Sequence, residues 1–122
     1  MAQDQLFSSS GPYPYLTICV EIRGVRFEGL ALLDTGYTGE LVIPSSALAE
    51  GIGDPVDVTN IQVADNRIVN SPTYLGQLGI PGLAEIPGVV VNALGDEYIL
   101  GLGILDLFEV TFDHGQRVIV RR

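Results

Sequence analysis

One short motif in the sequence combines residue types that could carry catalysis, Asp34-Thr35-Gly36. It directly follows an apolar run ending in Leu32-Leu33, so the sequence places a carboxylate at the mouth of a buried strand. An ionised group in such surroundings is costly unless it is paired or used. The carboxylate can serve as a general acid or base, and the competing interpretation is a turn residue that caps backbone N–H groups. Asp34 is therefore the first candidate for a catalytic residue.

The other reactive side chains are few and isolated. His114, the only His, falls in a predicted hairpin turn, and Cys19, the only Cys, lacks a basic neighbour that would activate its thiol. Neither has the companions that a metal site or a nucleophilic triad requires. Gly101-Leu102-Gly103 matches part of a dinucleotide-binding fingerprint, but the third glycine and the parallel βαβ setting are missing. We therefore expect neither a metal nor another cofactor.

The charge balance argues against polyanionic partners. The 122 residues include 15 acidic and 6 basic side chains, every basic one an Arg, and the formal net charge is −9. Nucleic acids and anionic membrane surfaces are bound through an excess of Lys and Arg, so we expect neither as a partner. The hydrophobic content of 47% is that of one folded domain and not of a disordered acidic segment.

Three features favour a cytoplasmic location. A single Cys cannot form an intrachain disulfide, as expected of a protein made in a reducing compartment. No apolar run approaches the roughly 18 residues of a membrane span. The first residues, Met1-Ala2-Gln3-Asp4-Gln5, lack the basic and apolar regions of a signal peptide.

Apolar periodicity predicts an all-β domain over residues 15–122, preceded by a flexible arm over residues 1–14. Two short helices are expected, one at residues 47–50 and one within residues 102–108. Tight turns are expected at the two Ile-Pro-Gly sequences, residues 80–82 and 86–88. Alternating or β-branched apolar residues predict strands at residues 16–23, 25–33, 41–43, 56–64, 67–80, 89–91, 98–101, 110–113 and 117–120.

The two longest middle strands are expected to form a hairpin. Asp65-Asn66 between them is a pair able to take positive φ, as tight hairpin turns require. Pro72 has no backbone N–H to donate, so this part of the second strand should lie at a sheet edge. The last two strands, joined across His114-Gly115, should form a second hairpin.

Leu32-Leu33-Asp34-Thr35-Gly36 resembles the active-site signature of the retropepsin-like aspartic proteases, the family of retroviral proteases and their small prokaryotic relatives. Tyr37-Thr38-Gly39 and the strand after it resemble the segment that follows that signature. The hairpin tipped by Asp65-Asn66 lies where the family has its flap. Tyr98-Ile99-Leu100-Gly101, ahead of a short helix, looks like the family's second signature. Together these features cover roughly residues 15–120.

The resemblance implies a closed, barrel-like all-β fold with a flap hairpin and one or two short helices. It implies a catalytic Asp34, with Thr35 hydrogen-bonding across the catalytic pair and Gly36 supplying an N–H toward the carboxylates. The flap residues expected to bind substrate are Ala64, Asp65, Asn66, Arg67 and Ile68. The second signature corresponds to Ile99, Leu100 and Gly101.

Peptide hydrolysis by two carboxyls requires a second Asp, because one activates the water while the other holds the proton. The chain has one Asp-Thr-Gly, and the surroundings of Asp65, Asp96 and Asp106 do not repeat it. The second carboxylate is therefore expected from Asp34 of a second copy, across a two-fold interface. This predicts a homodimeric aspartic endopeptidase that binds an extended peptide, with apolar walls from the flap and from residues 41–43 and 89–91.

Two alternatives stay open at this stage. Retroviral members have a small residue where this chain has Tyr37, and a polar residue often stands where it has Leu102. Both departures favour a non-catalytic dimerisation or peptide-binding module that keeps the fold. The arm over residues 1–14 suggests a zymogen, in which a precursor segment occupies the cleft or disturbs the interface.

Overall fold

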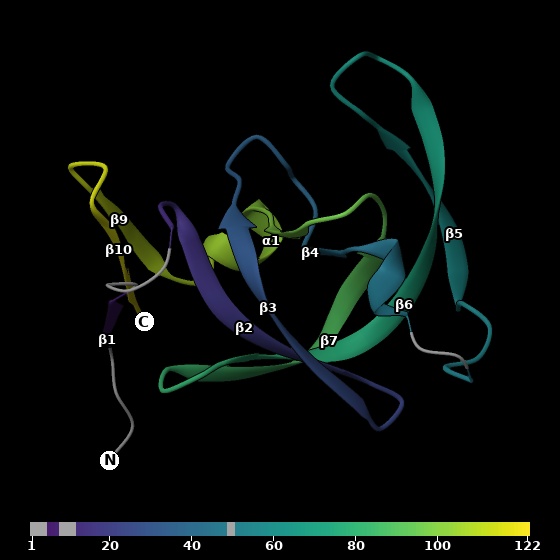
Figure 1. The fold of residues 1–122 in the computed structure, drawn as a ribbon, viewed down its shortest axis with the longest axis horizontal. Helices are drawn as coiled ribbons and strands as arrows, with labels where there is room; N and C mark the ends of the chain where they lie inside the picture. Colours follow the sequence, from purple (N-terminus) through teal and green to yellow (C-terminus); the bar gives the residue numbers. More distant parts are fainter. Residues whose placement is uncertain (1–4, 8–11, 49–50) are drawn as a thin grey trace.

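The structure is a computed structural model, and it describes residues 5–7, 12–48 and 51–122. Over these residues the chain is mostly β, as predicted (Figure 1). The strands are β1 (Gln5–Phe7), β2 (Tyr15–Ile22), β3 (Val25–Leu33), β4 (Leu41–Ile43), β5 (Asp57–Gln62), β6 (Ile68–Ile80), β7 (Ala84–Ala93), β8 (Tyr98–Leu100), β9 (Glu109–Asp113) and β10 (Arg117–Arg121). A 3₁₀ turn, η1 (Ser45–Ala47), and a short helix, α1 (Leu102–Leu105), complete the described elements.

Six strands close into a barrel, which confirms the predicted architecture. They follow one another in the order β2-β3-β8-β4-β7-β6, and β2 pairs with β6 to complete the ring. β5 pairs with β6 outside this ring. Closure leaves few unpaired strand edges, which is one way in which β-proteins avoid edge-to-edge aggregation.

The barrel interior is filled by the alternating apolar residues that the sequence pattern identifies. In β2, Leu16, Ile18, Val20 and Ile22 are all 2% exposed or less. Burying each such side chain contributes roughly 1.5–3 kcal/mol to folding. The end of β3 keeps the alternation, since Leu30 is 43% exposed whereas Ala31 and Leu33 are buried.

β8 lies between β3 and β4, and this arrangement positions the Asp34 motif. β3 runs parallel to β8, with Leu33 opposite Leu100. β4 runs antiparallel to β8 on its other side, with Leu41 also opposite Leu100. The loop from β3 to β4 must therefore pass around the end of β8. Residues 34–40 form this loop.

The β5–β6 hairpin confirms the predicted pairing, and its tip extends beyond the barrel (Figure 1). Pro72 lies opposite Val58 in this hairpin, and the pairing of β6 with β7 begins only at Thr73. Pro72 therefore stands in the part of β6 that has no second neighbouring strand, as its missing N–H requires.

The predicted turn at residues 86–88 is wrong, because these residues lie inside β7. β6 and β7 shift register between Gly76 and Leu78, where Pro87 and Gly88 together oppose one residue. Gly88 has φ +66°. A β-bulge accommodates both a residue without an N–H and a left-handed glycine, so the same residue types serve a bulge as well as a turn.

The helices are shorter than predicted. The helix expected at residues 47–50 is replaced by η1, which begins at Ser45, and residues 49–50 lie outside the described residues. The helix expected within residues 102–108 is the single turn α1, which ends at Leu105. Ile104 and Leu105 are buried in it, so the apolar density that suggested a longer helix reflects core packing.

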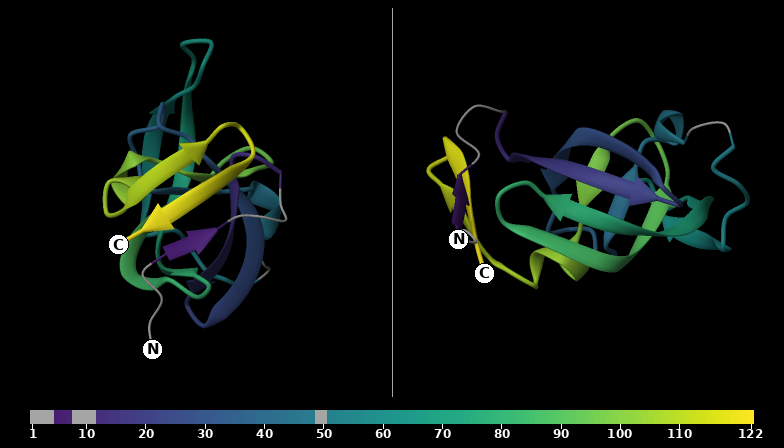
Figure 2. Two further views of the ribbon diagram at one scale, coloured as in Figure 1. Left: turned by 90° about the vertical axis from the view of Figure 1, so that its left-hand side faces the viewer. Right: turned by 90° about the horizontal axis from the view of Figure 1, so that it is seen from below.

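A small sheet in the order β1-β10-β9 stands at one end of the barrel (Figure 2). Its β9–β10 hairpin confirms the predicted terminal hairpin, and Val118 and Val120 of β10 are buried in the core. β1 corrects the predicted arm in part, since residues 5–7 pair with residues 119–121. Strand pairing satisfies backbone groups that an arm would leave to water. Residues 12–14 of the predicted arm are also held in place, since the Pro14 carbonyl accepts the Leu33 N–H at 3.1 Å. Arm residues 1–4 and 8–11 lie outside the described residues.

Candidate active site

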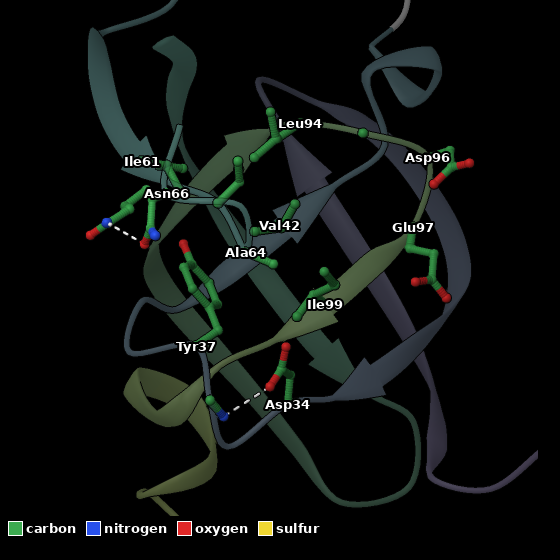
Figure 3. Close-up of a pocket in the computed structure, with 14 residues that line it drawn as sticks. Asp34, Tyr37, Val42, Ile61, Ala64, Asn66, Leu94, Asp96, Glu97 and Ile99 are labelled. Carbon is green, nitrogen blue, oxygen red and sulfur yellow. Dashed lines mark hydrogen bonds between the residues drawn. The ribbon is translucent and has the colours of Figure 1, made fainter. Parts of the chain in front are cut away.

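Asp34 stands at the point where β3 leaves the barrel, and backbone hydrogen bonds fix its position. Its N–H donates to the Leu100 carbonyl at 3.0 Å, and its own carbonyl accepts the N–H of Tyr37 at 3.3 Å. The Gly36 N–H donates to Oδ1 of the carboxylate at 2.8 Å (Figure 3). The half-buried carboxylate is therefore oriented by the loop that the motif itself forms.

Three backbone hydrogen bonds join the Asp34 loop to the segment after β8. Leu102 N–H donates to Tyr37 at 2.8 Å, Gly103 N–H to Gly39 at 2.9 Å and Gly101 N–H to Glu40 at 2.9 Å. The two signatures identified in the sequence are thus adjacent in the structure. Asp34 lies in a loop whose conformation is held along most of its length.

The glycines of the two signatures are explained by close contacts. A Cβ on Gly101 would lie 2.3 Å from the Gly39 carbonyl oxygen and 2.5 Å from Cδ2 of Tyr37. A Cβ on Gly36 would lie 3.1 Å from Oδ1 of Asp34.

Thr35, which lies between Asp34 and Gly36 in the sequence, is exposed in the single chain. Its expected hydrogen bond across a catalytic pair stays a prediction.

A cavity of about 630 Å³ separates the Asp34 loop from the tip of the β5–β6 hairpin. Figure 3 shows Asp34 and Ile99 on one side of it and Ala64 and Asn66 on the other. Its lining includes Asp34, Val42, Ile61, Ala64, Asn66 and Ile99. A cavity of this volume, with apolar side chains and the Asp34 carboxylate in its lining, has the size and composition of a ligand-binding site.

The hairpin tip holds the five residues predicted to bind substrate, and they divide into two groups. Ala64 and Asn66 line the cavity. Asp65 and Arg67 instead form an exposed ion pair at 2.6 Å on the tip, and Ile68 is 70% exposed outside the cavity lining. Asn66 has φ +67°, the conformation that its residue type predicted.

The sequence reasoning missed the loop after β7 as part of the cavity. Leu94, Gly95, Asp96 and Glu97 all line it. Tyr15 donates from its hydroxyl to Glu97 Oε1 at 2.6 Å, and this hydrogen bond, with burial and the charge of Glu97, raises the pKa of Tyr15. The acidic pair was visible in the sequence, but only the pairing of β7 and β8 with β4 brings its loop to the cleft.

The predicted apolar walls are corrected in part. Val42 lines the cavity, and Val90 lines a second cavity of about 570 Å³ on the β5 side. Their neighbours in the same strands point into the core, because side chains alternate across a strand. These core residues are Leu41, Ile43, Val89 and Val91.

Tyr37 borders both cavities and is half-buried. Its hydroxyl donates to Oδ1 of Asn92 at 3.4 Å. Burial, and to a lesser degree the charge of Glu40, raises the pKa of Tyr37. The phenol therefore stays protonated, and able to donate, throughout the physiological pH range.

Cys19 has a basic neighbour, contrary to the expectation from sequence. The pairing of β2 with β3 brings Arg26 Nη2 to 3.5 Å from the Cys19 sulfur.

Among the residues that the structure describes, no group of three or more His, Cys, Asp and Glu side chains is placed to hold a metal ion. In the same part of the chain, no helix is long and apolar enough to cross a membrane.

The fold is that of a retropepsin-like aspartic protease: a closed barrel with β8 inserted between β3 and β4 and the Asp-Thr-Gly loop passing around its end. The resemblance inferred from the motifs is therefore confirmed for the fold. The chain is similar to the crystal structure of a retropepsin-like aspartic protease from Rickettsia conorii, with a TM-score of 0.61 and 16% sequence identity. The similarity covers 95% of this chain and 89% of that one. No protein-family model and no curated protein matches the sequence.

Proposed function

We propose that the protein is an aspartic endopeptidase that acts as a homodimer. The observation that carries this proposal is the position of Asp34, whose carboxylate is oriented by the Gly36 N–H at the floor of a cavity of about 630 Å³. The fold, similar to that of a retropepsin-like aspartic protease, supports it.

In the proposed mechanism, Asp34 of each copy faces the other across a two-fold axis. Two carboxyls within a few ångström of each other cannot both ionise, so one is a carboxylate and the other keeps its proton. The carboxylate removes a proton from the attacking water, and the protonated partner supplies a proton for the departing amine. Thr35 and Gly36 hold the pair in place. One chain holds half of this site, so the activity requires a dimer.

The proposed substrate is an extended peptide lying between the Asp34 loop and the β5–β6 hairpin, which acts as the flap. Backbone groups of the peptide pair with the hairpin as an added strand would. Val42, Ile61 and Ile99 supply apolar surface in the cavity, which favours apolar substrate side chains. The proposed partners are therefore a peptide or protein substrate and a second copy of the chain. The cytoplasm is the proposed location, supported by the single Cys.

The test compares the wild type with Asp34→Asn on a broad peptide library from pH 3 to 7. Asn has nearly the same size as Asp but cannot serve as the base. We expect wild-type cleavage and a loss of about 10³-fold or more in the variant. Sedimentation at the assay concentration shows whether the dimer is present. Equal cleavage by both proteins would contradict the proposal, and so would a wild-type dimer that cleaves nothing.

A non-catalytic peptide-binding module is the second candidate. Tyr37 favours it, because its ring borders both cavities beside Asp34. Peptide binding by a wild-type dimer without cleavage at any tested pH would support this candidate over the protease.

A further inference from the structure

Four side chains form a hydrogen-bonded chain from the Asp34 loop to the base of the β5–β6 hairpin. Tyr37 donates to Asn92 Oδ1 at 3.4 Å, and Asn92 Nδ2 donates to Thr73 Oγ1 at 3.0 Å. The hydroxyls of Thr73 and Thr59 lie 2.6 Å apart, and either can be the donor. The chain thus runs from the loop after β3 through β7 and β6 to β5. We refer to it as the polar relay.

Two members of the relay are buried at positions where apolar side chains are the usual occupants. Asn92 is 4% exposed and Thr73 is 6% exposed. Buried polar groups are costly unless they are hydrogen-bonded, so removing one member leaves its neighbour unsatisfied. No buried side-chain nitrogen or oxygen of the described residues lacks a partner. Every buried polar side-chain atom of the relay therefore has at least one hydrogen-bond partner, which favours a single conformation of the network.

The relay's two ends stand at functionally distinct places. Tyr37 follows Asp34-Thr35-Gly36 directly, and Figure 3 shows its ring extending from beside Asp34 toward the hairpin. Thr59 and Thr73 stand at the base of the hairpin whose tip, residues 61–66, borders the cavity. A small rotation at the base of a long hairpin displaces its tip by a larger distance. The base is therefore where the height of the tip above Asp34 is set.

We propose that the polar relay positions the β5–β6 hairpin over Asp34, with Tyr37 as the positioning residue that links hairpin placement to substrate binding. This inference rests on the proposed function. The contact from Tyr37 to Asn92 is the longest of the three, and active-site hydrogen bonds are often long in a free enzyme and shorten with substrate bound. Tyr37 acts through the hairpin and takes no part in the proton transfers.

The first test measures kinetics of Tyr37→Phe, which removes the hydroxyl and keeps the ring. We expect KM to rise about fivefold, the factor of one neutral hydrogen bond, with kcat changed less than about twofold. Tyr13→Phe is the control, because Tyr13 packs against Phe112, lines neither cavity and takes no part in the relay. An unchanged KM in Tyr37→Phe overturns the proposal, as does an equal rise in Tyr13→Phe.

A second pair of variants tests the relay at its other end. Thr73→Val keeps the shape and removes the hydroxyl, whereas Thr73→Ser keeps the hydroxyl. We expect Thr73→Val to raise KM about fivefold and Thr73→Ser to restore nearly wild-type behaviour. Because the relay acts as a unit, Tyr37→Phe combined with Thr73→Val should cost little more than either change alone. If the KM of the double variant rises by the product of the two single-variant factors, the two residues act independently and the relay proposal is overturned.

Hydrogen exchange separates failure of this inference from failure of the proposed function, because it needs no substrate. In Thr73→Val the amides of the hairpin, residues 57–76, should exchange about fivefold faster than in Thr73→Ser, while those of β2 serve as the internal reference for folding. If no peptide is cleaved but this difference is found, the protease assignment fails and hairpin positioning stands. Identical exchange in the two variants overturns the inference whatever the activity.

Discussion

At the scale of single residues, Gly101 shows how strictly packing selects one residue type. Its Cα faces the backbone of the Asp34 loop so closely that a Cβ would lie 2.3 Å from the carbonyl oxygen of Gly39. The backbone of the Asp34 loop cannot move away from Gly101 without breaking the hydrogen bonds that residues 101–103 donate to it. The glycine is thus required by the close contact between the segment after β8 and the Asp34 loop.

Gly101→Ala should therefore destabilise the protein by about 3 kcal/mol or more, because overpacking against fixed backbone forces the loop and β8 apart. Urea unfolding measures the loss. Gly115→Asn is the control, since Gly115 has φ +69° in open space and Asn tolerates that conformation at a cost below about 1 kcal/mol. An alanine variant as stable as the control would refute the steric explanation.

Residue types alone were enough to single out Asp34 and the second signature as candidate site residues, because each motif is local in the sequence. The contact of Arg26 with Cys19 was not accessible in this way, since it arises from the register of β2 with β3. Asp96 and Glu97 could not be predicted as cavity residues for the same reason, because the pairing of distant strands places their loop. Strand register and loop placement are set by the whole barrel, and a single sequence specifies them only through the sum of its packing.

At the scale of elements, strands were predictable wherever one face is buried, because alternation records that burial directly. β2 and the β9–β10 hairpin are examples. The bulge at Pro87-Gly88 was mistaken for a turn, since both need the same backbone angles. Pairing partners far apart in sequence, such as β1 with β10, left no local pattern to detect.

The turn of the β9–β10 hairpin carries a pH-dependent interaction. Asp113 accepts hydrogen bonds from His114 Nδ1 and from Arg117 Nε, each at 2.7 Å. The bond from His114 first, and then that from Arg117, lowers the pKa of Asp113 below its ordinary value of 3.8. Stabilisation by a depressed pKa is fully present above the ordinary value and is lost as pH falls through the folded-state value.

We accordingly predict that Asp113→Asn makes stability less sensitive to acid. The fall in Tm between pH 6 and pH 3 should be smaller in the variant than in the wild type. Asp106→Asn, an exposed change outside the hairpin, should leave the wild-type difference unaltered. An equal fall in Tm for Asp113→Asn and the wild type would show that the pair contributes nothing to the pH dependence.

At the scale of the whole molecule, charge opposes the assembly that the proposed function requires. One chain carries −9, so two carry −18, twice that value. This repulsion is screened by salt, with a Debye length of about 10 Å at 0.1 M, and it weakens as carboxylates become protonated.

Dimer population and peptidase activity should consequently rise together on mild acidification or added salt. Sedimentation equilibrium at pH 5 and pH 8, each at low and high salt, measures the dimer, and the cleavage rate is followed in the same solutions. Activity that follows the dimer fraction supports the charge explanation. Equal dimer content at pH 5 and pH 8 at low salt would refute it.

The insertion of β8 between β3 and β4 also dictates when a newly made chain can form the Asp34 loop. Asp34 emerges from the ribosome in the first third of the chain, but its loop is held by residues 100–103. Domains fold once the segments that complete them have been synthesised, and long-range pairings form late. The loop that surrounds Asp34 can therefore be ordered only after residues 100–103 have been synthesised. On the proposed function, a nascent chain cannot cleave a peptide before that point.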